Sequence, residues 1–291
     1  MPVGICKLCK SETELRLSHF IPKFVGKWVK ETSATGYIRM NHSINKRSQD
    51  IAKEYWLCGE CEQLFSGWER EFANKIFYPM VDKKNDTARY GDWLAKFCAS
   101  LSWRTLTYVR SVNPAADSDT EEKATAAENA LADYLLGKST NLGEYEQHLY
   151  PVEGIASSDM TNLPKNINRY LLRTMQMDIV SNTENMIIFT KLPGFILMGL
   201  TGHPEAKEMR SSRVALGDGI LKPRKYTFPS GVGDYIFAKA EQIAETYKTM
   251  SPSQQKMIDA SIRKNPQRAA KSGTIEAFEH DLSMFGPKIF N

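Results

Sequence analysis

Two Cys-x-x-Cys pairs near the start of the chain constrain its fold more than any other feature. The first pair is Cys6 and Cys9, and the second is Cys58 and Cys61. Four thiols in two closely spaced pairs match the tetrahedral ligand set of zinc, because each pair fits one tight turn around the metal. A site with four sulfur ligands has no open coordination position. We therefore expect a structural Zn²⁺ that stabilises the fold and does not catalyse.

The redox compartment decides between zinc and disulfides. The start of the chain, MPVGICKLCK, has no apolar signal-peptide core, and 291 residues with 42% hydrophobic content can bury a core without disulfides. We expect a cytoplasmic protein with zinc-bound thiolates; disulfides or a redox pair are the alternatives. The fifth cysteine, Cys98, is expected to be an inert buried thiol. The apolar runs are shorter than the roughly 20 residues of a membrane span, so no membrane partner is expected.

The hydrophobic pattern predicts an α+β protein in two domains. Residues 1–82 carry the cysteines and form a zinc domain, and residues 83–291 form a mixed, helix-rich α+β domain. Within the first domain, Pro22, Gly26 and Gly36 favour strands and loops over one long helix.

Other segments have clear periodicity. Apolar residues recur at helical spacing in 62–76 and again in 90–110. Residues 186–200 are β-branched, aromatic and apolar around a Pro-Gly turn, which predicts a buried β-hairpin. Ser251 followed by Pro252 predicts the start of a helix.

One histidine between the pairs is not needed for zinc. His19 lies in the run Ser18-His19-Phe20-Ile21-Pro22-Lys23. Together with the Cys6-x-x-Cys9 turn before it and Leu57-Cys58-x-x-Cys61-Glu62 after it, this run resembles the zinc-containing HNH endonucleases. These are ββα-metal nucleases built on a treble-clef finger. The resemblance covers residues 1–75.

The resemblance implies a treble-clef, ββα-metal fold and roles for individual residues. His19 takes the place of the general base that deprotonates the attacking water, and an imidazole suits that task near neutral pH. Glu62 takes the place of a residue that helps to hold a catalytic Mg²⁺ or Mn²⁺. Asn41, Asn45 or Asp50 could replace the family's central Asn, and we place Asn45 in the candidate site.

The charge distribution points to a polyanion. Residues 1–50 hold nine Lys and Arg against four acidic residues, more than the whole chain's net charge of +4. Such a bias favours nucleic acid, because binding releases counterions from the phosphates; an ordinary solvated surface is the alternative. The candidate nucleic-acid-binding residues are Lys23, Lys27, Lys30, Arg39 and Arg47.

The resulting hypothesis is a metal-dependent endonuclease that cleaves phosphodiester bonds, with DNA favoured by the resemblance. A role in bacterial restriction or phage defence would fit, and the larger domain would then recognise a target, form a homo-oligomer or bind a regulatory partner. Ser18 and Lys53 replace the Asp and Asn that the family usually has. They favour the alternative, a non-catalytic treble-clef module that binds nucleic acid or protein. An enzyme within residues 83–291 is a third class.

Overall fold

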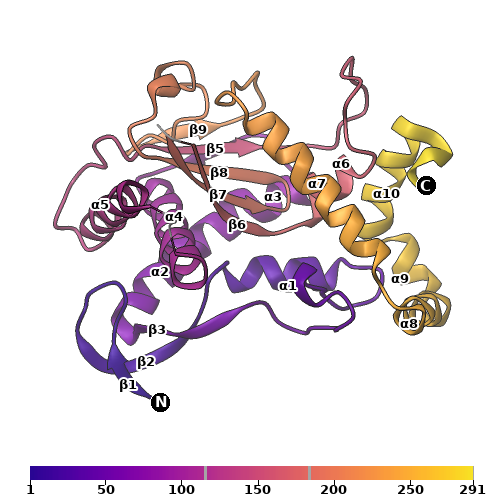
Figure 1. Ribbon diagram of the computed structural model, residues 1–291, viewed down its shortest axis with the longest axis horizontal. Helices are drawn as coiled ribbons and strands as arrows, with labels where there is room; N and C mark the ends of the chain where they lie inside the picture. Colours follow the sequence, from indigo (N-terminus) through magenta and orange to yellow (C-terminus); the bar gives the residue numbers. More distant parts are fainter. Residues whose placement is uncertain (115–116, 183–184, 291) are drawn as a thin grey trace.

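The computed structural model describes residues 1–114, 117–182 and 185–290, and it confirms the mixed α+β class. The cysteine-bearing part begins with a three-stranded antiparallel sheet and the helices around it (Figure 1). Its elements are β1 (Val3–Ile5), β2 (Glu12–His19), α1 (Lys23–Glu31), β3 (Lys53–Cys58), α2 (Gly59–Phe72) and α3 (Tyr78–Val81). The order in this sheet is β1-β2-β3, so β2 is central.

Helix α1 differs from the sequence prediction of strands and loops. Pro22 precedes the helix as its N-cap residue, where its missing N–H is not needed. Gly26 is inside the helix because a Cβ there would lie 2.8 Å from Cγ2 of Ile51, so the residue allows close packing and does not break the helix. The apolar face formed by Val25 and Val29 is buried and outweighs the low helix propensity of glycine.

The second part of the chain is built around a four-stranded antiparallel sheet of order β5-β8-β7-β6. Its elements are β4 (Ala88–Tyr90), α4 (Trp93–Val112), α5 (Ser118–Leu135), β5 (Gln147–Pro151), α6 (Ile167–Arg173), β6 (Gln176–Ser181), β7 (Met186–Leu192), β8 (Phe195–Leu200) and β9 (Gly219–Leu221). The predicted hairpin is confirmed as β7 and β8. The C-terminal helices are α7 (Val232–Lys248), α8 (Pro252–Lys264), α9 (Pro266–Ala270) and α10 (Gly273–Phe285).

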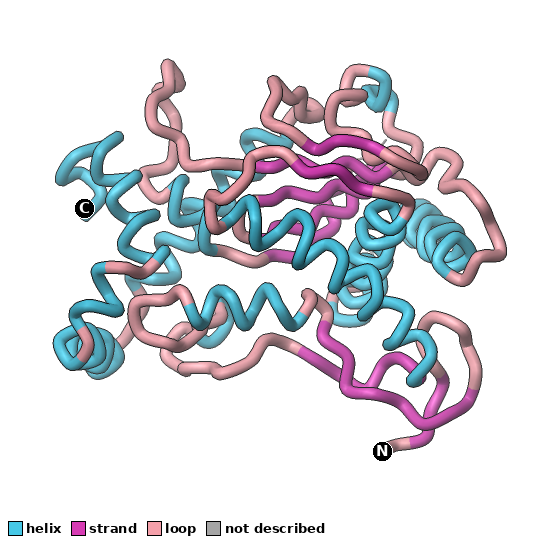
Figure 2. The backbone as a smooth tube through the Cα atoms, turned by 180° about the vertical axis from the view of Figure 1, so that it is seen from behind, coloured by secondary structure: helices cyan, strands magenta, loops and turns pink. Residues whose placement is uncertain are grey.

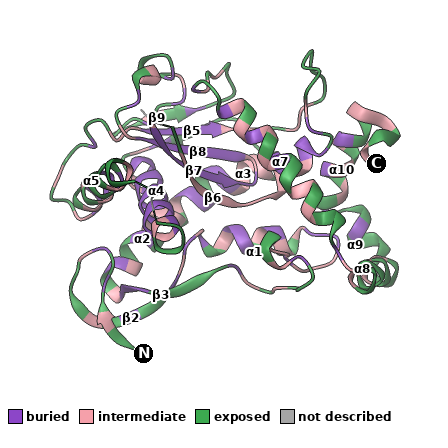
Figure 3. Ribbon diagram, in the orientation of Figure 1, coloured by how far each residue is buried: buried purple, intermediate pink, exposed green. Residues whose placement is uncertain are grey.

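Helices cover both faces of this sheet, which is why its central strands are buried throughout (Figure 3). Ile188 of β7 faces the apolar cluster that contains α4, whereas its neighbours Ile187 and Phe189 face the cluster that contains α6 and α7. Successive side chains of a strand point to opposite faces of the sheet, and here the residues on both faces are apolar because both faces are covered.

Helix α4 joins the two parts of the chain through one apolar core. Its residue Trp103 is fully buried and its ring lies 6.0 Å from that of Trp56 on β3 and 5.9 Å from that of Phe65 on α2. The same cluster contains Cys98, whose burial raises the thiol pKa, as expected for an inert cysteine. Among the described residues, no helix combines the length and the apolar character needed to cross a bilayer.

Candidate metal centre and active site

The four paired cysteines converge in space. Cys6 and Cys9 lie in the turn between β1 and β2, Cys58 is the N-cap of α2, and Cys61 lies in the first turn of that helix. All four Sγ atoms lie within 4.8 Å of one another, and the Sγ atoms of Cys9 and Cys58 are 3.8 Å apart. Four sulfurs at about 2.3 Å from a tetrahedral zinc ion would be about 3.8 Å apart, so the cluster has the dimensions of a zinc site.

Backbone N–H groups point at the sulfurs. The amide of Cys58 donates to Sγ of Cys6 at 3.3 Å, and the amide of Cys61 donates to Sγ of Cys58 at 3.4 Å. Lys10, at φ 63°, closes the first turn by donating its N–H to the Cys6 carbonyl at 2.9 Å. The two N–H···S hydrogen bonds stabilise negative charge on the sulfurs, and the N-terminus of α2 adds to the effect.

The pKa shifts of the cluster thiols also fit a cation site. The hydrogen bond from the Cys61 side chain lowers the pKa of Cys6 to about 4 against the opposing effect of burial. The same hydrogen bond and burial raise the pKa of Cys61. A divalent cation at this site would stabilise the thiolate form of the four cysteines. The residues present fit zinc.

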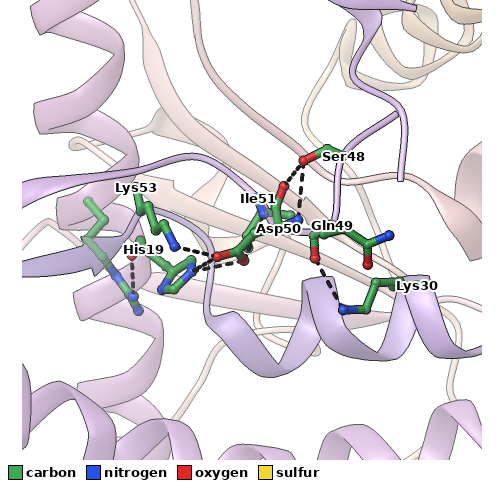
Figure 4. A network of polar contacts seen from close by, with 8 residues as sticks. His19, Lys30, Ser48, Gln49, Asp50, Ile51 and Lys53 are labelled. Atoms are coloured by element: carbon green, nitrogen blue, oxygen red, sulfur yellow. Dashed lines mark hydrogen bonds and ion pairs between the residues drawn. The ribbon is translucent and has the colours of Figure 1, made fainter. Parts of the chain in front are cut away.

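His19 lies at the end of β2, next to the cross-strand residue Lys53 of β3 (Figure 4). Its side chain is 12% exposed, and its Nε2 lies 3.1 and 3.2 Å from the two carboxylate oxygens of Asp50. The Lys53 ammonium contacts Oδ2 of Asp50 at 2.6 Å, and the Ile51 amide donates to Oδ1 at 2.9 Å. Burial would raise the pKa of Asp50, but Lys53, Ile51 and His19 together lower it to about 2. Asp50 is therefore a carboxylate at neutral pH.

The face of β2 opposite His19 packs against helix α2. Ser18 is 2% exposed, and its hydroxyl donates to Oε2 of Glu62 at 2.6 Å. The guanidinium of Arg104, on α4, donates to the His19 carbonyl at 3.2 Å and to Oε1 of Glu69 at 2.7 Å. The backbone of the strand end that carries His19 is thus fixed by an ion pair between the buried Arg104 of α4 and the half-buried Glu69 of α2.

The structure separates some residues that the sequence analysis grouped. Ser18 and His19 are consecutive in a strand, so their side chains point to opposite faces: Ser18 contacts Glu62, and His19 contacts Asp50. The Asn45 side chain does not reach His19 by hydrogen bond, since its Oδ1 accepts from the Ser251 amide at 2.8 Å. Of the three loop residues considered, Asp50 is the hydrogen-bond partner of His19.

The predicted basic residues lie on α1 and on the loop that follows it. Lys23 and Lys27 are exposed on α1. Lys30 donates to the Gln49 carbonyl at 3.2 Å, Arg39 donates to the side chain of Gln254 on α8 at 3.1 Å, and the guanidinium of Arg47 lies 4.8 Å from the centre of a tyrosine ring. Two of the five residues, Lys30 and Arg39, therefore bind other parts of the loop and the C-terminal helices.

Sequence reasoning missed Arg104. It is 3% exposed in a helix with fourteen buried residues. The available signal was its charge: a single arginine in the middle of a segment that is apolar on most faces must find a buried acidic partner.

Comparisons of this chain with protein-family models, with curated proteins and with solved structures find no match in any of the three.

Proposed function

We propose that residues 1–82 form a zinc-stabilised, HNH-like endonuclease unit that hydrolyses phosphodiester bonds. The observation that carries the proposal is the hydrogen bond between His19 and the ionised Asp50. His19 is at the end of β2, a strand adjacent to the four-cysteine cluster. A histidine oriented by a carboxylate is the arrangement that proteins use for a general base.

The order of elements supports this proposal. Strands β2 and β3 pair antiparallel, and α2 follows β3 directly, with Cys58 as its N-cap residue. A cysteine turn, a pair of strands and a helix that begins at the second cysteine pair are the parts of a treble clef, and strand–strand–helix is the order of a ββα-metal nuclease. The fold expected from the resemblance is therefore compatible with the order and pairing of these elements.

The hydrogen bond determines which ring nitrogen can accept a proton. A carboxylate only accepts hydrogen bonds, so Nε2 of His19 must carry the proton that Asp50 binds. The lone pair of the neutral ring is then on Nδ1. In the proposed reaction Nδ1 takes a proton from water, the water oxygen attacks phosphorus, and the bond to the leaving oxygen breaks.

The Mg²⁺ or Mn²⁺ that the resemblance implies would be held by Glu62 and Ser18. Glu62 supplies one carboxylate, the fewest that Mg²⁺ commonly takes from a protein, and the Ser18 hydroxyl, which is 2% exposed, is a weak second ligand. When bound, such an ion stabilises negative charge on the phosphate.

The second candidate function is a zinc module that binds nucleic acid or protein without cleavage. It is favoured by the opposite directions of the Ser18 and His19 side chains, which separate the base from the Glu62 carboxylate.

Cleavage of supercoiled plasmid and of labelled RNA, with Mg²⁺ or Mn²⁺, distinguishes the two functions. The nuclease proposal expects metal-dependent nicking by the wild type and a loss of at least about 100-fold in His19→Ala. His280→Ala, at a half-buried histidine of α10 outside residues 1–82, is the matched control and should cleave like the wild type. The proposal fails if the folded, zinc-loaded wild type does not cleave, or if His19→Ala cleaves equally well.

A further inference from the structure

Two segments about 200 residues apart in the sequence form one surface. The loop of residues 32–49, which follows α1, lies beside residues 251–272, which contain α8 and α9 (Figures 1 and 2). Direct hydrogen bonds join them: the Ser251 amide donates to Asn45, and Arg39 donates to Gln254. We name these two segments together the basic arm.

The basic arm concentrates the positive charge of the protein. It holds eight basic residues and one acidic residue, Asp259, so its formal charge is +7 while that of the whole chain is +4. The remainder of the chain is therefore negative, at −3. The basic residues are Arg39, Lys46, Arg47, Lys256, Arg263, Lys264, Arg268 and Lys271.

Helix α8 presents its charges to solvent. Ile258 and Ile262 are half-buried toward the protein, whereas Lys256, Arg263 and Lys264 are exposed. Within the described parts of the chain, these three cations and the exposed Lys271 have no ion-pair partner. Three cations on one helix without counterions repel one another, so the helix is suited to a polyanion.

Hydrogen bonds hold the helical segment of the basic arm against α1 of the candidate nuclease unit. Arg268 donates to the carbonyls of Ser33, Lys30 and Glu31 at 3.1–3.2 Å, at the C-terminal end of α1. The Ser251 and Gln254 contacts hold the other end of α8. The cations therefore keep fixed positions relative to α1, as a preformed binding surface requires.

The same loop leads to His19. Its last residue, Gln49, is held by Lys30, and the next residue is Asp50, which contacts His19 (Figure 4). The loop of the basic arm is therefore joined directly to Asp50, the hydrogen-bond partner of the proposed general base.

We infer that the basic arm binds the phosphate backbone of a nucleic-acid duplex and directs it toward His19. The thirteen residues of α8 span about 20 Å, the length of about six phosphates along one strand. An anionic membrane fits less well, because the isoleucines of α8 face the protein and would not enter lipid. The inference rests on the proposed function only in assigning the duplex as the substrate of His19.

The test measures binding separately from cleavage. Lys256, Arg263, Lys264 and Lys271 are replaced by Gln in a His19→Ala background, and binding of a fluorescent 30-base-pair duplex, as DNA and as RNA, is followed by anisotropy at several salt concentrations. The matched control replaces four exposed basic residues outside the arm, Lys207, Arg210, Lys222 and Lys225, by Gln. Circular dichroism and the melting temperature confirm that each variant is folded.

We expect the arm variant to bind at least about 10-fold more weakly at 0.1 M salt, with a slope of log K against log salt reduced by about three. The control should stay within twofold of the parent. The inference fails if the arm variant binds like its parent, or if the control loses as much. It also fails if the arm variant loses binding to phosphatidylserine vesicles but not to duplexes, or if polyglutamate of equal charge displaces the duplex fully.

The binding and cleavage results can fail independently. Loss of binding in the arm variant together with no cleavage by the wild type would keep the basic arm and reject the nuclease. Normal binding in the arm variant together with cleavage by the wild type would keep the nuclease and reject the basic arm.

Discussion

His19 and Asp50, thirty-one residues apart in the chain, are joined by a hydrogen bond of 3.1 Å from Nε2 to Oδ1. The carboxylate also binds the ammonium of Lys53, which stands across from His19 in the neighbouring strand. A histidine, an acid and a lysine therefore form one charged group at the end of β2. Lys53, which replaces the Asn expected from the resemblance, acts here by keeping Asp50 ionised.

Replacing Asp50 with Asn tests whether the carboxylate orients His19. The amide cannot supply the negative charge that holds Nε2–H, so we expect cleavage by the proposed nuclease to fall about 100-fold or more with little change in substrate binding. Asp218→Asn, at an exposed loop position, is the control. Cleavage by Asp50→Asn at the wild-type rate would show that His19 does not need this partner.

The zinc site predicts a metal content of about one zinc per chain, measured by mass spectrometry of metals. Cys58→Ser should lose the metal and lower the melting temperature, because zinc binding contributes to the free energy of folding. A serine can still cap α2, so the loss would report the metal and not the cap. Cys98→Ala removes a buried thiol outside the cluster and should retain the metal. A wild type purified without added metal or chelator that contains far less than one zinc would contradict the site.

The sequence predicted structure best at residues, such as paired cysteines or a Pro-Gly turn, that are compatible with few local structures. The Cys-x-x-Cys spacing predicted a cluster that is confirmed, and the Pro-Gly turn predicted the β7–β8 hairpin. Helix α1 was missed because the reason for Gly26 lies in Ile51, a contact across the fold that no local pattern shows. Asp50 could not be chosen over Asn45 for the same reason: α1 and a long loop separate both from His19, and sequence spacing does not fix where such a loop folds.

Removing the Arg104 side chain should destabilise the protein strongly. Arg104→Met leaves Glu69 as a partly buried charge without its partner, and we expect a loss of about 3–5 kcal/mol in the free energy of unfolding. Urea denaturation measures it. Lys75→Met breaks the exposed pair with Glu71 and should cost less than about 1 kcal/mol. Equal losses in the two variants would show that the buried pair has no special role.

Buried His148 should make the protein sensitive to mild acid. Burial lowers its pKa from 6.5 to about 4, while Nδ1 bonds the Ser212 hydroxyl at 3.0 Å. The unfolded chain therefore binds a proton between pH 6.5 and 4 that the folded protein does not, and stability falls as the pH falls through this window. A shift of this size corresponds to about 3 kcal/mol, and this is an upper value because the Glu146 carboxylate, 3.5 Å from Nε2, would partly stabilise the protonated ring.

His148→Gln removes this proton and should flatten the stability curve between pH 7 and pH 4. Acid also protonates zinc thiolates, but it does so in both proteins, so the difference between the two urea-denaturation series isolates His148. Parallel curves for wild type and variant would contradict the assignment.

Ser18→Asp tests the proposed cation position directly. The new carboxylate would lie beside Glu62, whose Oε2 now accepts the Ser18 hydroxyl at 2.6 Å, at a position only 2% exposed. Two carboxylates this close repel each other unless a cation lies between them, so the variant should melt lower than the wild type in EDTA-free buffer without added divalent ions. Mn²⁺ should then raise its melting temperature by several degrees, more than that of the wild type, because an ion that binds only the folded state stabilises it. Ser18→Asn has nearly the same shape without the charge and should show the smaller, wild-type response. If Mn²⁺ stabilises the Asp and Asn variants equally, Glu62 does not mark a cation site, and the non-catalytic module becomes the better description of residues 1–82.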